Sequence, residues 1–287
     1  MQKTNISYLT HTWNPIAMRC TRVSEGCREC WHLRTADRLS KNPGLPEDER
    51  RALAGEGPFI LRERELLAPL GTKKPAVIGV QFMGDLFHED VPDSFRDDVY
   101  AVMHGCDRHT YLALTKRADN LLRYLQTHFL PEYQGRDHIY HGLTICNQPE
   151  LDAKIGDFLK VPGRKFLSLE PMLGPIAFPA KMAIIECPTC GDGERWTSNP
   201  QPTQCYRCGE IQTIKSKIDA VVLGGETLGN RPGRNMKLEW VESIAYQCKV
   251  ADVSLFIKQL HINGKLSFDM NEWPEHLRIR QLPWRTQ

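Results

Sequence analysis

The sequence contains 287 residues, of which 37 are Lys or Arg and 35 are Asp or Glu, so its net charge gives no electrostatic argument for a nucleic-acid partner. No apolar run approaches the roughly 20 residues that a membrane span needs, and the first residues lack the apolar core of a secretion signal. We therefore expect a cytoplasmic protein without a membrane partner, whose ten cysteines are metal ligands or buried thiols rather than disulfides.

The first motif along the chain is a loop that carries three cysteines. Cys20, Cys27 and Cys30 lie close together in the sequence, just before a helical pattern begins. A mononuclear zinc site usually takes four protein ligands, whereas a [4Fe–4S] cluster held by three thiolates keeps one iron free to bind a small molecule. The number of cysteines therefore favours an iron–sulfur cluster with an open iron.

Short β-rich runs then alternate with amphipathic helical patterns, which predicts βα units around a parallel sheet. The expected strands are Ala76–Met83, Thr110–Thr115, Ile139–Ile145, Lys165–Leu169, Ala220–Leu223 and Ser254–Ile257. The apolar residues at helical spacing are Phe95, Val99, Val102 and Met103 after an Asp93/Ser94 cap, then Leu121, Leu122 and Leu125, then Leu238, Val241, Ile244, Ala245 and Cys248. The third pattern predicts that Cys248 is a buried core thiol and not a ligand.

Polar or glycine-bearing segments follow six of the strands, and in a parallel α/β barrel such strand ends meet at one mouth. Glu170, Glu226 and Lys258 are the charged residues there that we expect nearest to a substrate; the alternative is a buried ion pair. His88 is a candidate proton-transfer group, or only a partner for its acidic neighbours. Lys116 and Arg117 contribute to this site, or they begin a solvated helix.

One section, residues 186–213, interrupts the alternation. Its two Cys-x-x-Cys pairs are Cys187 with Cys190 and Cys205 with Cys208. This spacing favours a tetrathiolate zinc ribbon over a redox dithiol pair or a second iron–sulfur cluster. We expect three parts: 1–185, the first part of a barrel with the cysteine loop; 186–213, the ribbon insertion; and 214–287, the last part of the barrel and a C-terminal extension.

Seven segments together resemble a radical-SAM-like family of phages and bacteria, which is distantly similar to spore photoproduct lyase. These segments are Thr12–Pro15, Gly26–Trp31, Met83–Pro92, Leu114–Arg117, Leu169–Pro175, Gly224–Glu226 and Phe256–Gln259. The resemblance implies a partial (β/α) TIM-type barrel of the radical S-adenosylmethionine (SAM) kind. Six residues separate the first two cysteines, where the superfamily's usual motif has three, and the longer spacing is this family's own pattern.

The resemblance also implies roles for individual residues. Cys20, Cys27 and Cys30 match the cluster ligands, and Trp31 occupies an aromatic position that can shield the cluster. Gly84 and Asp85 lie where the family receives the amino group of SAM, with Asp85 as the acceptor. The implied reaction is reductive cleavage of SAM, in which an electron donor such as flavodoxin or ferredoxin supplies the electron. The resulting radical abstracts hydrogen, and a nucleic acid or nucleotide base is the expected substrate.

One other class of protein remains open. A non-enzymatic nucleic-acid-binding protein would use the zinc ribbon and basic residues, with the N-terminal cysteines as a second structural metal site. Its first site would need a fourth thiol from Cys106 or Cys146. A zinc hydrolase is not supported, because the sequence contains no His-rich metal motif and no nucleophile elbow.

Overall fold

The structure, a computed structural model, describes residues 1–128, 137–179, 182–187, 189–190, 204–210, 213–228 and 233–284. The chain divides into two compact units. Unit 1 comprises Met1–Cys146 and Asp152–Arg164, and unit 2 comprises Asn147–Leu151 and Lys165–Gln287. Parallel strands connected by helices occur in both, which confirms the expected α/β class. No helix in the described ranges is long and apolar enough to cross a membrane.

The strands of unit 1 are ordered β1-β2-β5-β6-β7 in a mostly parallel sheet. Their bounds are β1 (Gln2–Lys3), β2 (His11–Trp13), β5 (Val77–Val80), β6 (Thr110–Thr115) and β7 (Ile139–Thr144). Only β1 pairs antiparallel with its neighbour among these five strands. A second, antiparallel pair joins β3 (Ile16–Ala17) to β4 (Ile60–Leu61). The segments after β2, β5, β6 and β7 therefore leave the same edge of the parallel sheet, where ligands of such sheets bind.

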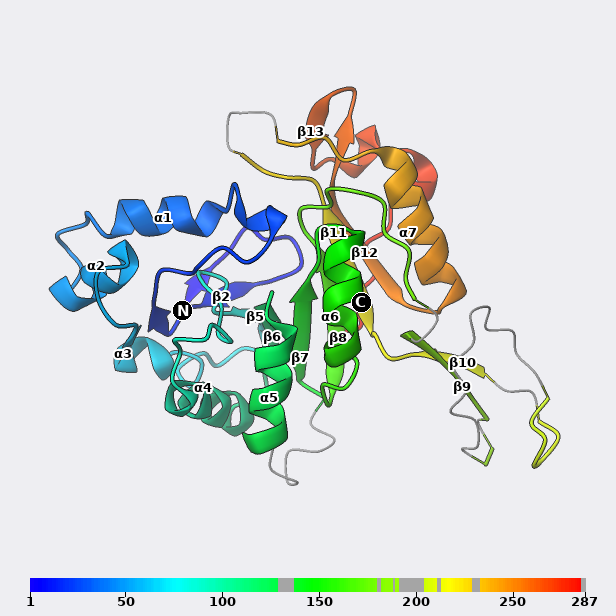
Figure 1. The fold of residues 1–287 in the computed structure, drawn as a ribbon, viewed down its shortest axis with the longest axis horizontal. Helices are drawn as coiled ribbons and strands as arrows, with labels where there is room; N and C mark the ends of the chain where they lie inside the picture. The colour runs from blue at the N-terminus through cyan, green and yellow to red at the C-terminus, as the bar shows by residue number, and fades with distance from the viewer. Residues whose placement is uncertain are drawn as a thin grey trace. The chain divides into compact units, whose positions relative to one another are not determined.

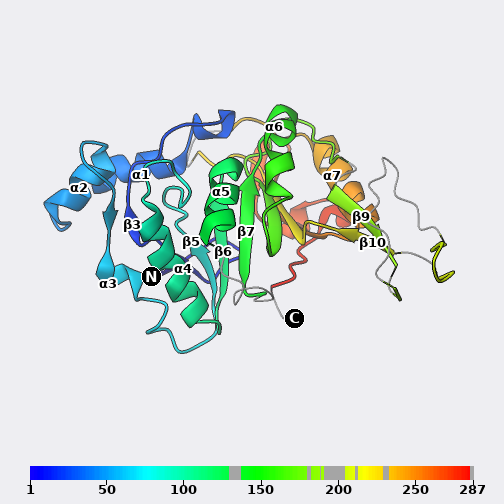
Figure 2. The same ribbon diagram turned by 60° about the horizontal axis from the view of Figure 1, so that its bottom comes forward.

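Helices connect the strands and bury their apolar faces. Those that precede β8 are α1 (Trp31–Leu39), α2 (Glu47–Ala54), α3 (Glu63–Leu66), α4 (Asp93–Gly105), α5 (Ala118–His128) and α6 (Gln148–Phe158), with a 3-10 turn, η1, at Glu25–Cys27. Helices α4 and α5 lie side by side against the strands of unit 1 (Figures 1 and 2). Leu121, Leu122 and Leu125 of α5 are buried, as predicted.

Helix α4 already includes Asp93 and Ser94, the residues that were expected to cap it. The residue before the helix is Pro92, and Asp93 is already its first residue. The φ of Pro92 is −60°, which proline holds without further constraint, so the chain enters the helix there. The carboxylate of Asp93 is therefore not the helix cap but the partner of Arg96 and Arg123.

Unit 2 contains the last parallel strands. They are β8 (Arg164–Leu169, of which Arg164 belongs to unit 1), β11 (Ala220–Gly224) and β12 (Ser254–Ile262), followed by antiparallel β13 (Lys265–Ser267). Helix α7 (Leu238–Val250) packs on β12, and two 3-10 turns, η4 (Met270–Glu272) and η5 (Glu275–Leu277), follow. Cys248 of α7 is buried, as predicted, and burial raises the pKa of its thiol to about 12.

A separate hairpin of unit 2 pairs β9 (Ala183–Glu186) with β10 (Thr213–Ser216). Both views show the two strands side by side, with the yellow-green segment 204–210 beyond one end of the hairpin (Figures 1 and 2). The described part of the expected 186–213 insertion is thus its two ends and residues 189–190 and 204–210. The division of the chain into 1–185, 186–213 and 214–287 stays a prediction.

All six expected strands are present; two of their C-terminal ends differ by a single residue, and those of β5 and β12 differ by more. Strand β5 stops at Val80 rather than Met83, because Gln81 has a φ of +52° and turns the chain out of the sheet. Strand β12 continues to Ile262, beyond the expected Ile257. Asn263 and Gly264 both have positive φ and form the tight turn that pairs β12 with β13.

Candidate functional site

The three-cysteine loop follows β2, the first parallel strand of unit 1. Cys20 is half-buried, Cys27 is buried, and Cys30 is the residue before α1. The loop reaches the helix through two successive turns, in which the Cys27 N–H donates to Ser24 O (2.9 Å) and the Cys30 N–H to Cys27 O (3.3 Å). Short-range backbone bonds therefore shape the half of the loop that contains Cys27 and Cys30.

Cys20, at the other end of the loop, is tied to the end of β6 by Arg117. One guanidinium nitrogen, Nη1, donates to Cys20 Sγ at 3.8 Å, and Nη2 donates to Thr21 Oγ1 at 2.7 Å. Arg117 is only 5% exposed, so it does not begin a solvated helix. This contact joins residues that are 97 positions apart in the sequence.

Two carboxylates from the segment after β5 hold Arg117. Its Nη1 lies 3.0 Å from Asp85 Oδ2 and its Nε lies 2.6 Å from Glu89 Oε2. Asp85 also accepts hydrogen bonds from Thr115 Oγ1 (2.7 Å) and from the backbone N–H groups of Phe87 (2.9 Å) and Lys116 (3.2 Å). The buried Asp85 carboxylate therefore has four donors, and it orients Arg117. Its expected contact with the amino group of SAM stays a prediction.

The charges of this network shift its pKa values. Burial disfavours the charged form of Arg117, but the charge of Asp85 and the hydrogen bond to Glu89 outweigh burial, and the pKa of Arg117 is raised. Burial alone would raise the pKa of Glu89, yet its hydrogen bond with Arg117 lowers that pKa to about 2. Burial raises the pKa of the Cys20 thiol to about 12, and Arg117 opposes this rise. Arg117 is thus the group that favours a thiolate at Cys20.

Glycine is required at position 84 by its surroundings. Gly84 has a φ of +134°, which side chains of L-residues rarely adopt, and a Cβ atom there would lie 2.5 Å from Met18 Sδ. Gln81 closes the same segment onto the loop after β2: its side chain accepts from the Ile16 N–H (3.0 Å) and donates to Ile16 O (2.8 Å). The glycine-bearing segment and the cysteine loop are therefore packed together in unit 1.

His88 is fully buried beneath the loop. The Asp90 N–H donates to its Nδ1 (3.1 Å), the Thr21 N–H donates to its Nε2 (3.4 Å), and Nε2 also lies 2.9 Å from Thr21 Oγ1. Burial, followed by the charge of Arg117, lowers the pKa of His88. His88 is therefore neutral near pH 7 and supports Thr21; a proton-transfer role for it stays a prediction.

Trp31 and Lys116 lie at the edges of the same loop. Trp31 is 47% exposed, and its ring meets His32 edge-on at 6.4 Å; its shielding of a cluster stays a prediction. Burial would raise the pKa of Cys27, but hydrogen bonds from Ser24 and the Val23 backbone and the charge of Lys116 lower it. Lys116 Nζ also lies 3.8 Å from Sγ of Cys146, at the end of β7.

The expected site residues of unit 2 form two ion pairs. Lys258 Nζ lies 2.8 Å from Glu170 Oε1, and the Ser168 hydroxyl lies 3.4 Å from Glu170 Oε2. Glu226 pairs with Arg234 instead, whose backbone N–H (3.0 Å) and Nε (2.9 Å) both donate to Glu226 Oε2. All three charged side chains are therefore ion-paired, and their roles toward a substrate stay predictions.

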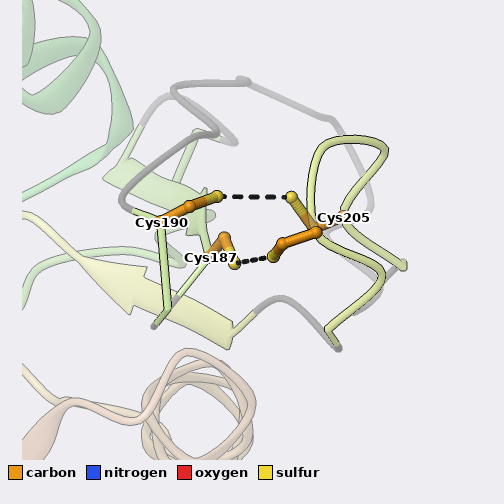
Figure 3. A group of neighbouring side chains, drawn as sticks. Cys187, Cys190 and Cys205 are labelled. Carbon is orange, nitrogen blue, oxygen red and sulfur yellow. Dashed lines mark hydrogen bonds between the residues drawn. The ribbon is translucent and has the colours of Figure 1, made fainter.

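The four cysteines of the insertion gather as a candidate metal centre. Sγ atoms of Cys187, Cys190, Cys205 and Cys208 all lie within 4.8 Å of one another. Cys187 and Cys208 are 3.3 Å apart at sulfur, and Cys190 and Cys205 are 3.6 Å apart; Figure 3 marks both contacts. Four thiolates at this spacing suit a metal such as zinc, or an iron–sulfur cluster.

Comparison with known proteins gives a family for the chain. Residues 3–272 match the family described as "Protein of unknown function (DUF5131)". The chain belongs to this family. No curated protein and no solved structure matches the sequence. The DUF5131 match includes both the three-cysteine loop and the four-cysteine group.

In this DUF5131 chain, sequence reasoning gave Arg117 a place in the site as one of two alternatives, and it assigned no role to Glu89, Thr21 or Gln81. Arg117, Glu89 and Thr21 carry the contacts between the loop and the strand ends, and Gln81 closes the loop after β2 onto the same segment. The position of Arg117 directly after a strand was a signal for it, because the ends of neighbouring parallel strands meet. Nothing local in the sequence distinguishes Gln81.

Proposed function

We propose that this chain is a radical SAM enzyme whose [4Fe–4S] cluster is held by Cys20, Cys27 and Cys30. The observation that carries the proposal is one of topology and contact. The cysteine loop follows the first parallel strand, β2, the glycine-bearing segment follows the next, β5, and Arg117 connects the two segments at the end of β6. This succession supports a partial (β/α) barrel of the radical SAM kind.

The residues of the loop fit a cluster better than a single metal ion. Among described residues, the four cysteines of the insertion are the one group of three or more ligand atoms gathered within 4.8 Å, and Cys20, Cys27 and Cys30 are not so gathered. A single ion needs such close ligands, whereas a four-iron cubane spreads its thiolates more widely. This favours the enzyme over the alternative, a nucleic-acid-binding protein with two structural metal sites.

A cluster held by Cys20, Cys27 and Cys30 would supply the electron for reductive cleavage of SAM, and so the radical that would abstract hydrogen from the substrate. The chain's own residues position these groups. Gly84 lets the backbone approach the loop, and Asp85 and Glu89 keep the Arg117 guanidinium on Cys20. The buried positions of Asp85, His88 and Arg117 support exclusion of water from this edge of unit 1.

We assign Glu170, Glu226 and Lys258 to SAM or substrate contacts. Glu170 and Glu226 lie just after β8 and β11, Lys258 lies within β12, and each is paired with a charged neighbour that sets its orientation. The substrate we propose is a nucleic acid or nucleotide base, and the electron donor is a protein such as flavodoxin or ferredoxin. A nucleic-acid-binding protein without radical chemistry is the second candidate, favoured by the four-cysteine group.

For the four-cysteine group we propose zinc. Four sulfurs at about 2.3 Å from a tetrahedral zinc ion lie about 3.8 Å from one another. The sulfur separations of 3.3 and 3.6 Å are close to that value and too short for the wider spacing of a cubane. A closed tetrathiolate site stabilises its own segment and leaves no position for substrate.

The test is anaerobic reconstitution with iron and sulfide, followed by reduction in the presence of SAM. We expect about four irons per chain besides zinc, and formation of 5′-deoxyadenosine. Replacement of Cys20, Cys27 and Cys30 by Ala should remove the iron and leave the zinc. Iron retention by this triple variant, or no SAM cleavage by the reduced, cluster-loaded protein, would contradict the proposal; two zincs and no sulfide would favour the binding protein.

A further inference from the structure

We propose that Arg117 is a positioning residue of the cluster: its N–H group donates to the ligating sulfur of Cys20 and raises the reduction potential of the cluster. This inference rests on the proposed function and goes beyond it, because the three-cysteine pattern assigns no role to any arginine. It concerns a residue that touches a ligand and not the substrate.

The geometry of the guanidinium carries the first step. Arg117 has five N–H donors in a planar fork, and four acceptors surround it: Cys20 Sγ, Thr21 Oγ1, Asp85 Oδ2 and Glu89 Oε2. The two carboxylates bind Nη1 and Nε, so they fix the rotation of the plane. The N–H groups that are left, on Nη1 and Nη2, donate to Cys20 Sγ and Thr21 Oγ1 of the cysteine loop.

The surroundings of Asp85 and Glu89 make this orientation rigid. Asp85 is held by Thr115 Oγ1 and two backbone N–H groups, and it cannot turn away from Arg117 without losing them. The Thr21 hydroxyl accepts from Arg117 and lies 3.3 Å from Glu89 Oε1, to which it donates. The guanidinium of Arg117 is thus held by acceptors of the cysteine loop as well as by the two carboxylates after β5.

The effect on a cluster follows from the charge of its ligands. A cubane with three thiolates becomes more negative on reduction, so a cation and an N–H donor at one sulfur stabilise the reduced form. Lys116 is the second cation at this edge, but it acts on Cys27 and contacts Cys146. Arg117 is the cation that donates to Cys20.

Three variants test the inference: Arg117→Lys, Arg117→Gln and, as the control, Arg123→Gln. Lys keeps the charge but loses the fork, whereas Gln loses both. Arg123 is an exposed arginine of α5 that pairs with Asp93, away from the cysteines. Each protein is reconstituted anaerobically, its iron content and far-UV circular dichroism are measured, and the midpoint potential of the cluster is determined by a redox titration followed by electron paramagnetic resonance.

We expect Arg117→Gln to shift the midpoint potential to more negative values and to lose iron faster on dilution, Arg117→Lys to show a smaller shift, and Arg123→Gln to match the wild type. A merely structural role would change iron retention without changing the potential. If Arg117→Gln does not fold, the shift in Arg117→Lys decides. Wild-type potentials in both Arg117 variants would overturn the inference alone, whereas a wild type that binds no cluster would overturn the proposed function with it.

Discussion

The Cα atom of Gly84 faces the Sδ atom of Met18 so closely that a Cβ atom on Gly84 would lie 2.5 Å from it. Met18 is fully buried and precedes Cys20 by two residues, so its side chain joins the cysteine loop after β2 to the backbone of the glycine-bearing segment after β5. The shape of the candidate site in unit 1 depends on this close approach.

We therefore expect Gly84→Ala to destabilise the protein by about 1–3 kcal/mol, because the variant must relieve both the clash and the positive φ. The measurement is the urea midpoint, followed by circular dichroism. Gly105→Ala is the matched control: it lies at the end of α4, no atom is within 4 Å of its added Cβ, and we expect no loss of stability. Equal midpoints for the two variants would contradict the packing described for Gly84.

Cys190→Ala should remove zinc and leave iron. Three thiolates remain in that variant, and a structural zinc site binds weakly without its fourth ligand. Metal analysis after dialysis against a chelator measures both metals in one sample. Cys248→Ala is the control, because Cys248 is a buried thiol of the same unit and lies outside the four-cysteine group. The zinc content of the Cys248→Ala variant should equal that of the wild type. Full zinc retention by Cys190→Ala would show that the four sulfurs do not act as one site.

The pair Glu170–Lys258 is suited to a double-mutant cycle with Glu170→Gln and Lys258→Met. Their side chains are 14% and 24% exposed and 2.8 Å apart, so we expect a coupling free energy of about 1 kcal/mol in unfolding. The exposed pair Asp157–Lys160, at 43% and 64%, is the control, with coupling below about 0.5 kcal/mol.

The same double variant distinguishes a structural role of Glu170 and Lys258 from a role in the reaction. If the two residues only stabilise each other, the folded double variant should form 5′-deoxyadenosine from SAM at the wild-type rate. Our proposal for Glu170 and Lys258 predicts a slower rate in the double variant even where it is fully folded. A wild-type rate would remove both residues from the list of SAM and substrate contacts.

Stability should rise with pH between about 8 and 10.5 because of Lys165. Burial lowers the pKa of Lys165 to about 8 from its ordinary 10.5, against the opposing charge of Asp219. The native state thus disfavours the charged form: the stability that Lys165 contributes is complete above the unfolded pKa and is lost as the pH falls through 8. The difference corresponds to about 3 kcal/mol.

Lys165→Met should accordingly stabilise the protein at pH 7. The difference in free energy of unfolding between this variant and the wild type should shrink from pH 8 to 10.5. Urea unfolding at several pH values measures this difference. Lys160→Met, at an exposed lysine, should show a pH profile parallel to that of the wild type. An advantage of Lys165→Met that does not change with pH would exclude titration of Lys165 as its cause.

Prediction from sequence was most successful where the pattern is local. The runs at Thr110–Thr115 and Ala220–Leu223 were recognised because apolar and β-branched residues follow each other there without interruption. Strand β2 was missed, since three residues are too few to show a pattern. The hairpin of β12 and β13 was also missed, although Asn263-Gly264 is a strong turn signal.

The candidate site divides in the same way. Sequence alone determined the two groups of cysteines, because a metal ligand is recognised by residue type and spacing, and it determined the order of the six expected strands and of α4, α5 and α7. The tertiary structure decided that Arg117 is buried rather than solvated, and that Glu226 pairs with Arg234. Whether a charged side chain is buried depends on the partners that neutralise it, and the partners of Arg117 lie 28 to 97 residues away, in segments that only the fold brings together.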